Sequence, residues 1–429
     1  MAEYSEYKDS GIPWIGRIPS HWDVKPIRSF LSQSKELNAD ENATLLTLSQ
    51  YKGVNIRNGN EDSSISASES LIGYNVVHKG QFVMNIMLAW NGSYGVSDYD
   101  GVISPAYAIF NFKDSVCKAF YHYLWRTKAY QDAFKSRSKG IVDSRLRLYP
   151  QYFLPFYTSI PPIEEQEAIV EYLDKVTSDI DNTIAAKERI IAALEERRKI
   201  IITHAVTHGI NPDVPMRNSG IDWLEEIPAH WEVKPIKRLA YLTLGKMLDS
   251  SNIPSFSIMR PYVCAKDVHF DGVNLSELRE MPFTIEEERK FQIKNGDLLV
   301  VEGGAAGTCA VVKDVNQCIC AQKTLIIARC NENALNQYLA YILYICVKFG
   351  VIETICNKST FLHFTKEKMA ALQIPVPPID EQALIVGTIQ SELSPIDSVI
   401  TQQRKLIDLL RERKNIIINE TVTGKVKVI

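Results

Sequence analysis

The sequence lacks long apolar runs, and its first half has almost no cysteine. No stretch of the 429 residues approaches the ~18 uninterrupted apolar residues of a membrane span. The opening MAEYSEYKDS has neither the basic nor the apolar region of a secretory signal. Of eight cysteines, only Cys117 precedes Cys264, so the first half holds no disulfide framework. We expect a cytoplasmic protein with reduced thiols.

A large excess of charge is also missing. The formal net charge is −3, which argues against a whole surface that coats a polyanion non-specifically. One local exception is residues 118–147, which contain eight Lys or Arg residues and two Asp residues, for a net charge of +6. The composition, 45% apolar and 23% charged, is that of a globular protein. The length allows two or three domains.

Catalytic patterns are absent. Residues 303–307 are rich in glycine but no Lys-Ser/Thr follows them, so they do not form a P-loop. The sequence contains neither HExxH nor the Asn-Pro-Pro-Tyr tetrapeptide of amino-methyltransferases. Asp297 and Glu302 lie close together, but no lysine stands two residues after Glu302, as a nuclease-type metal site requires. We therefore expect no catalytic site in this chain.

The thiol-rich stretch around Cys318 and Cys320 does not predict a metal site. With Cys309 and Cys330 nearby it suggests zinc, but the spacing is C-x-C instead of C-x₂-C. We interpret these cysteines as small core residues on strands.

The chain contains one unit, roughly 210 residues long, twice. Residues 10–30 read SGIPWIGRIPSHWDVKPIRSF and residues 219–239 read SGIDWLEEIPAHWEVKPIKRL, with 12 of 21 positions identical. Further pairs follow in the same order: PPIEEQ and PPIDEQ (161–166, 377–382), LEERRKIII and LRERKNIII (194–202, 410–418), and AVTHG and TVTGK (205–209, 421–425). His21 and His230 occupy equivalent positions beside Trp22 and Trp231, and we interpret them as a packed His–Trp corner at the entry to each domain, with a catalytic role as the alternative.

The repeat predicts an α+β fold. We expect two similar mixed α/β domains separated by two long helices, related by a pseudo-two-fold internal repeat. The expected boundaries are 1–160 and 211–375 for the domains and 161–210 and 376–429 for the helices.

Local patterns predict the elements inside each domain. Short apolar runs at 44–48, 81–88 and 106–112 predict strands, and 119–134 predicts a helix. Residues 91–95 (NGSYG) line up with 306–310 (AGTCA). A strand, a glycine turn and a second strand explain both copies.

Apolar stripes at helical spacing predict that the two long helices face each other. Ser394-Pro395 predicts a helix start inside the second stripe, and Ser178-Asp179 allows one in the first. From Asp179 to Val206 is roughly 42 Å of helix at ~1.5 Å per residue. The stripes are Leu173, Val176, Ile180, Ile184, Ile191, Leu194 and Ile201 in the first copy, and Ile389, Ile396, Ile400, Ile407, Leu410 and Ile417 in the second.

Together these motifs resemble the specificity subunit of type I restriction–modification systems, over essentially the whole chain. The resemblance implies two target-recognition domains, each reading one half of a split double-stranded DNA target, on an antiparallel coiled-coil spacer. It implies two modification (methyltransferase) subunits as partners and restriction/translocase subunits beside them. S-adenosylmethionine, ATP and Mg are expected in those partners, and no cofactor in this chain.

DNA readers are expected on loops and turns that reach base edges. For each residue, a solvated surface role is the competing interpretation. The candidates are Asn91, Ser93, Arg137, Ser138, Lys139, Arg145 and Arg147 in the first copy, and Gln322, Lys323, Lys358, Ser359, Thr360 and His363 in the second.

Two other hypotheses remain open at this point. One is a scaffold or adaptor protein whose two domains bind peptides or proteins on a helical spacer, and the other is a fused enzyme. Salt dependence separates DNA binding from the scaffold, because phosphate contacts weaken steeply as salt rises.

Overall fold

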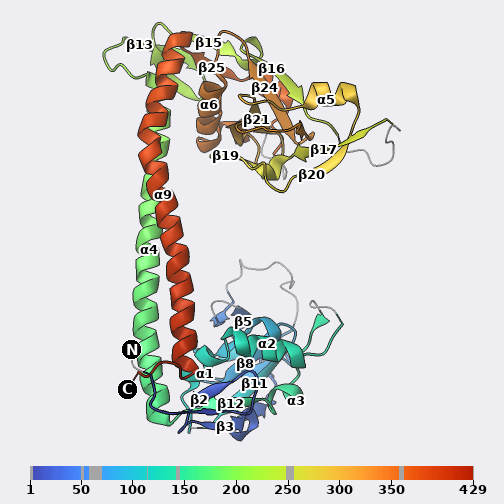
Figure 1. Cartoon of the computed structure of the whole chain (residues 1–429), viewed down its shortest axis with the longest axis vertical. Helices are drawn as coiled ribbons and strands as arrows, with labels where there is room; N and C mark the ends of the chain where they lie inside the picture. Colours follow the sequence, from blue (N-terminus) through green and yellow to red (C-terminus); the bar gives the residue numbers. More distant parts are fainter. Residues whose placement is uncertain are drawn as a thin grey trace. The chain divides into compact units, whose positions relative to one another are not determined.

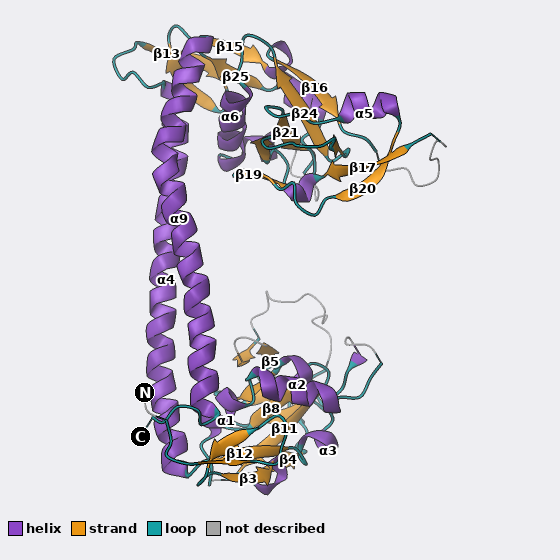
Figure 2. Cartoon of the chain, viewed as in Figure 1, coloured by secondary structure: helices purple, strands orange, loops and turns teal. Residues whose placement is uncertain are grey.

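The computed structural model describes residues 3–49, 53–57, 70–113, 115–141, 145–247, 256–356 and 362–428. The chain divides into two compact units. Unit 1 contains residues 1–187 and 405–429, and unit 2 contains residues 188–404. Each unit mixes helices and strands, as Figure 2 shows. No described helix is long and apolar enough to cross a membrane.

Unit 1 begins with a small hairpin and then builds a four-stranded antiparallel sheet in the order β4-β11-β8-β9. Figure 1 labels its two central strands, β11 and β8. Its strands are β1 (Tyr7–Asp9), β2 (Arg17–Pro19), β3 (Asp23–Pro26), β4 (Leu31–Ser34), β5 (Leu46–Ser49), β6 (Gly53–Ile56), β7 (Asn75–Val77), β8 (Phe82–Asn85), β9 (Tyr94–Val96), β10 (Gly101–Ile103), β11 (Tyr107–Phe112) and β12 (Tyr157–Ile160). Its short helices are η1 (Ile27–Ser29), η2 (Ala89–Asn91), α1 (Lys118–Leu124), α2 (Lys128–Arg137) and α3 (Pro150–Phe153).

An aromatic core holds unit 1 together. Phe82 of β8 stacks on Phe153 of α3 at 5.8 Å, and Trp125 after α1 meets Phe82 edge-on at 5.1 Å. Both long helices contribute to this core, through Leu173 of one and Val422 of the other. Burying such rings contributes about 1.5–3 kcal/mol each, so the helix ends are fixed to the domain by packing.

Unit 2 repeats the same sheet order, β16-β24-β21-β22, with every neighbouring pair antiparallel. Its strands are β13 (Met216–Ile221), β14 (Leu224–Pro228), β15 (Glu232–Pro235), β16 (Ala240–Leu244), β17 (Ile258–Val263), β18 (Val268–His269), β19 (Gly272–Val273), β20 (Arg279–Phe283), β21 (Leu298–Val301), β22 (Cys309–Val311), β23 (Cys320–Ala321), β24 (Leu325–Cys330) and β25 (Gln373–Val376). Its helices are η4 (Ile236–Arg238), η5 (Ala265–Asp267), α5 (Ile285–Phe291), α6 (Asn336–Lys348), α7 (Val351–Ile355) and α8 (Lys366–Ala371).

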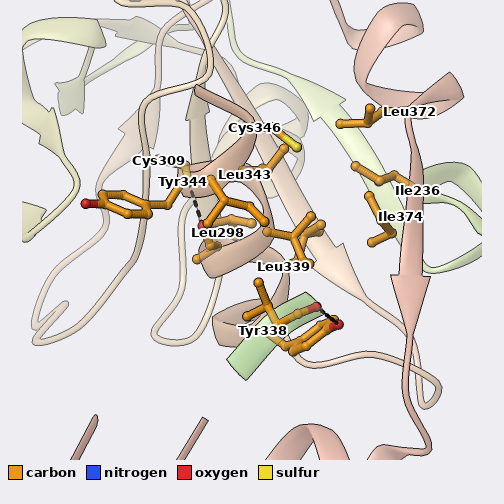
Figure 3. Packing of buried hydrophobic residues seen from close by; sticks show 14 of the residues in the cluster. Ile236, Leu298, Cys309, Tyr338, Leu339, Leu343, Tyr344, Cys346, Leu372 and Ile374 are labelled. Atoms are coloured by element: carbon orange, nitrogen blue, oxygen red, sulfur yellow. Dashed lines mark hydrogen bonds between the residues drawn. The ribbon is translucent and has the colours of Figure 1, made fainter. Parts of the chain in front are cut away.

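The largest core cluster of unit 2 is mostly aliphatic and includes one face of α6. Figure 3 shows Leu339 and Leu343 of this helix among the packed side chains, with Tyr338 at its start. The Tyr338 hydroxyl donates to the carbonyl of Pro375 at 3.1 Å and also lies 3.4 Å from that of Val206. The buried phenol is therefore satisfied, and it connects a strand of the domain with the end of a long helix.

The long helices are α4 (Ile163–His208) and α9 (Ile379–Val422), and each is a single element. The expected helix start at Ser394-Pro395 is therefore wrong, and so is the one allowed at Ser178-Asp179. Pro395 lies inside α9. A proline in a helix costs one hydrogen bond and some strain, and apolar burial of the same turn, where Leu393 and Ile396 are 4% and 8% exposed, offsets that cost.

Within each unit the two long helices run antiparallel. In unit 1, Lys414 of α9 pairs with Asp181 of α4 at 2.7 Å. In unit 2, Arg404 pairs with Glu195 at 3.0 Å, and Arg198 lies 3.6 Å from Asp397. The stripe residues Leu173, Ile180, Ile184, Ile389, Ile396, Ile400 and Ile407 are buried, and Val176, Ile191, Leu194, Ile201, Leu410 and Ile417 are half-buried.

Most local predictions for unit 1 are confirmed, with two corrections. The strands expected at 44–48, 81–88 and 106–112 correspond to β5, β8 and β11, although β8 ends at Asn85 because η2 follows. The helix expected over 119–134 is two helices, broken at residues 125–127. Thr127, the residue before α2, has an extended backbone, and its hydroxyl donates to the carbonyl of Leu124 at 2.8 Å.

The strand, glycine turn and strand expected in both copies is confirmed. β8 and β9 enclose Gly92, and β21 and β22 enclose Gly307. Both glycines have positive φ, +92° and +84°, a conformation that other residues rarely adopt.

Candidate nucleic-acid interface

The PPIxEQ junction fixes each domain to the start of its long helix. In unit 1 the buried Glu165 carboxylate accepts from the Trp22 indole at 3.0 Å and lies 2.8 Å from the His21 ring. The Tyr4 hydroxyl also donates to it. Burial and the Glu165 hydrogen bond raise the pKa of Tyr4, so it remains a donor. The next residue, Gln166, donates to the Pro161 carbonyl at 2.7 Å and accepts from the Cys117 amide at 2.9 Å.

The second copy repeats this junction, but its glutamate makes fewer bonds. His230 lies 2.8 Å from Glu381, and Gln382 donates to the Pro377 carbonyl at 2.9 Å. The Trp231 indole is buried but has no hydrogen-bond partner among the described residues. The interpretation of a packed His–Trp corner agrees with this geometry, since both indoles are buried while both histidines are half-exposed.

Unit 1 brings several of the predicted DNA readers together beside α2. Lys139 and Arg147 form an antiparallel backbone pair, with both N–H···O distances at 2.8 Å. Arg145, on the same segment, is exposed. The Leu148 amide donates to the Ile86 carbonyl at 2.9 Å, so the Arg147 segment lies against the loop that follows β8.

Aromatic rings lie beneath the cations of this surface, and sequence reasoning missed them. The Lys139 ammonium lies 5.2 Å from the Tyr152 ring centre, and the Lys135 ammonium 5.0 Å from that of Trp90. Arg137 lies 5.9 Å from the Phe156 ring. Such contacts contribute about 0.5–1 kcal/mol at exposed sites. Tyr149 and Tyr152 directly follow the basic stretch of residues 118–147 and were an available signal, whereas Trp90 lies 28 residues before this stretch and could not be linked to it from the sequence.

Several of the predicted readers, Asn91 among them, have local structural partners. Ser138 donates to the Phe134 carbonyl at 2.9 Å and closes α2. Ser93 is only 3% exposed and donates to the Asn91 side-chain oxygen at 2.9 Å. Gln322 accepts from both the amide and the hydroxyl of Thr324, at 3.0 and 2.6 Å. These side chains shape turns.

In unit 2 the described readers are fewer. Lys323 and His363 are exposed, and His363 pairs by a backbone bridge with Gly303. The Phe364 amide donates to the Glu302 carbonyl at 2.7 Å, as the Leu148 amide does to Ile86 in unit 1. His363 therefore occupies the position that Arg147 has in unit 1. Lys358, Ser359 and Thr360 lie outside the described residues.

The C-terminal end of α1 carries a half-buried basic pair, His122 and Arg126. Burial, followed by the nearby Arg126 charge, lowers the pKa of His122 to about 4. Burial likewise lowers the pKa of Arg126, whose guanidinium donates to the Tyr94 carbonyl at 2.6 Å. His122 is therefore neutral at physiological pH, and Arg126 supports the strand that follows the glycine turn.

The cysteines and carboxylates that suggest a metal site in the sequence have other partners in the structure. Cys309 and Cys320 are buried on β22 and β23 in apolar clusters. Asp297 accepts two bonds from Arg329, at 2.7 and 2.8 Å. Among the described residues, no three His, Cys, Asp or Glu side chains are arranged to hold a metal ion.

Comparison with known proteins identifies relatives of one kind. A family model described as the type I restriction modification DNA specificity domain matches residues 228–408. The putative type I restriction enzyme MjaX specificity subunit of Methanocaldococcus jannaschii is 26% identical over 276 residues, 63% of this chain and 59% of that protein. The MjaVIII specificity subunit of the same organism is 23% identical over 357 residues, 80% of this chain and 79% of that protein. The alignment thus spans less than two thirds of the MjaX subunit.

A solved structure shares the fold across nearly the whole chain. It is described as the structural basis of complex assembly and conformational transition of the type I R-M system, and it superposes with a TM-score of 0.69 at 15% identity. The match covers 95% of this chain and 99% of the other. The resemblance that the duplicated motifs indicated is confirmed. Residues 228–408 match the type I restriction modification DNA specificity domain, and the chain is similar to type I restriction enzyme specificity subunits over most of its length.

Proposed function

We propose that this chain is a non-catalytic, cytoplasmic specificity subunit that reads a split DNA target for a modification complex. Residues 1–160 and 211–375 act as its two target-recognition domains. Each reads one half-site. Two modification subunits bring S-adenosylmethionine, and restriction/translocase subunits bring ATP- and Mg-dependent chemistry.

The observation that carries this proposal is one framework presenting two different surfaces. The sheets β4-β11-β8-β9 and β16-β24-β21-β22 share their strand order, and both junctions repeat the His–Glu contact. At the equivalent position, however, unit 1 has the half-buried Arg147 and unit 2 has the exposed His363. Two domains that share a framework but differ in their DNA-reading residues are suited to recognising two different half-sites.

The long helices serve as the spacer in this proposal. Residues 161–210 and 376–429 form an antiparallel coiled coil with pseudo-two-fold symmetry, supported by the ion pairs between α4 and α9 within each unit. The repeated junctions offer two identical partner subunits equivalent docking surfaces. Net charge near zero means that affinity depends on the assembled complex, since non-specific DNA binding needs excess positive charge.

The test is sequencing of methylated DNA from cells that express this chain with its modification partner. We expect one split motif with a fixed gap and N6-methyladenine in each half, lost when the chain is omitted. Exchange of residues 20–158 for the matching segment of another family member should change one half-site only. If the assembled complex yields no chain-dependent motif, and its DNA binding does not weaken with salt, the scaffold hypothesis replaces this one.

A further inference from the structure

The loop after β8 holds two apolar side chains in solvent. Met87 is 37% and Leu88 40% exposed, although both belong to a tightly bonded turn. The Met87 amide donates to the Asn85 side chain at 2.9 Å, and the Leu88 amide to the Asn85 carbonyl at 3.1 Å. The next residue, Ala89, is fully buried. The turn is therefore anchored, and these two side chains remain outside the core.

This apolar pair adjoins the basic surface of unit 1. The Leu148 amide bonds to Ile86, the residue before Met87, which brings the Arg147 segment beside the turn. Trp90, two residues after Leu88, lies under the Lys135 ammonium. An apolar pair flanked by cations fits an anionic ligand that carries an apolar group, and DNA is such a ligand.

Unit 2 has no apolar side chain at the equivalent place. Since Glu302 corresponds to Ile86 by its bond to the Phe364 amide, the residues matching Met87 and Leu88 are Gly303 and Gly304. A Cβ added to Gly303 would lie 3.2 Å from the His363 ring. The two units therefore differ in apolar contact at one framework position.

We propose that Met87 and Leu88 contact the C5-methyl group of a thymine in the half-site read by unit 1, while unit 2 makes no such contact from its glycines. The thymine methyl is the apolar group that a major-groove edge of unmodified DNA presents, and apolar side chains recognise it. Arg147 and Lys139, alongside, supply the polar and phosphate contacts. This inference rests on the proposed function, because it assigns a base to the reader surface of unit 1.

The test uses the assembled modification complex and duplexes that carry its motif, with each thymine replaced in turn by deoxyuridine. This replacement removes only the methyl group. In the native complex, one such duplex should be methylated about fourfold less efficiently, the effect of one buried methyl-sized group. With Met87→Ala or Leu88→Ala, the thymine duplex should lose a similar factor, and replacement by deoxyuridine should then matter little.

Controls separate this inference from the proposed function. Leu37→Ala truncates another exposed apolar residue of unit 1 (63% exposed) and should keep the full deoxyuridine effect. Failure to methylate the split motif at all would refute the proposed function. Normal methylation without any deoxyuridine effect, or an effect unchanged in both variants, would overturn the thymine contact. Loss of modification-subunit binding in both variants, with unchanged thymine preference, would also overturn it and indicate a protein contact.

Discussion

Replacement of Glu165 by alanine should destabilise the protein far more than replacement of its counterpart Glu381. Glu165→Ala leaves the fully buried Trp22 indole and the Tyr4 hydroxyl without their acceptor. Each buried donor left unsatisfied costs about 1–3 kcal/mol, so we expect a loss of about 3 kcal/mol in unit 1.

Glu381→Ala is the matched control within the same chain. The Trp231 indole has no acceptor in the described structure to begin with, and the remaining His230–Glu381 pair is partly exposed. Exposed pairs contribute at most about 1 kcal/mol, which sets the expected loss in unit 2. The two variants thus remove the same carboxylate from the same repeated motif.

Hydrogen exchange followed by mass spectrometry can assign each effect to its unit. Peptides around residues 4–22 should exchange faster in Glu165→Ala, and peptides around 213–231 should change little in Glu381→Ala. Urea unfolding gives the free energies. Equal losses in the two variants, or a larger loss in Glu381→Ala, would refute the account based on unsatisfied buried donors.

Three other perturbations test separate features. Burial lowers the pKa of His122 to about 4, so the unfolded chain takes up a proton at this histidine before the folded chain does as the pH falls. The stability of the folded state is therefore full above pH ~6.5 and decreases as the pH falls toward 4. Urea unfolding across this range should show a decrease of up to about 3 kcal/mol, which His122→Gln removes. Pro395→Ala should stabilise α9 by about 1–3 kcal/mol by restoring a helical hydrogen bond, measured by thermal unfolding, and destabilisation would contradict this. Asp297→Ala should cost about 3 kcal/mol because Arg329 loses both bonds, and a neutral result in denaturant unfolding would show that water replaces the carboxylate.

The long helices and the glycine turns could be predicted from the sequence because each depends on the spacing of nearby residues. Apolar residues at helical intervals indicated α4 and α9, and repeated glycines marked the turns at Gly92 and Gly307. Local signals failed where burial decided the outcome. Ser394-Pro395 has the residues of a helix start, yet packing of Leu393 and Ile396 carries the helix through.

The readers were harder to predict because polarity does not show where a side chain lies. Ser93 and Arg145 are both polar loop residues, but Ser93 is buried in a turn and Arg145 is exposed. Met87 and Leu88 read as part of a strand, since nothing local shows that β8 ends at Asn85. The correspondence between Arg147 and His363 emerged from equivalent hydrogen bonds to the residues that follow β8 and β21, Ile86 and Glu302.

The division of the units along the chain has a consequence for synthesis on the ribosome. Residues 188–404 are continuous, so unit 2 can fold as soon as they have emerged. Unit 1 needs residues 405–429, which are made later, because Val422 belongs to its core and Gly424 lies against Pro19 and Trp22. The first domain to emerge is thus the later of the two to complete its core, and its aromatic residues depend on protection from aggregation until α9 arrives.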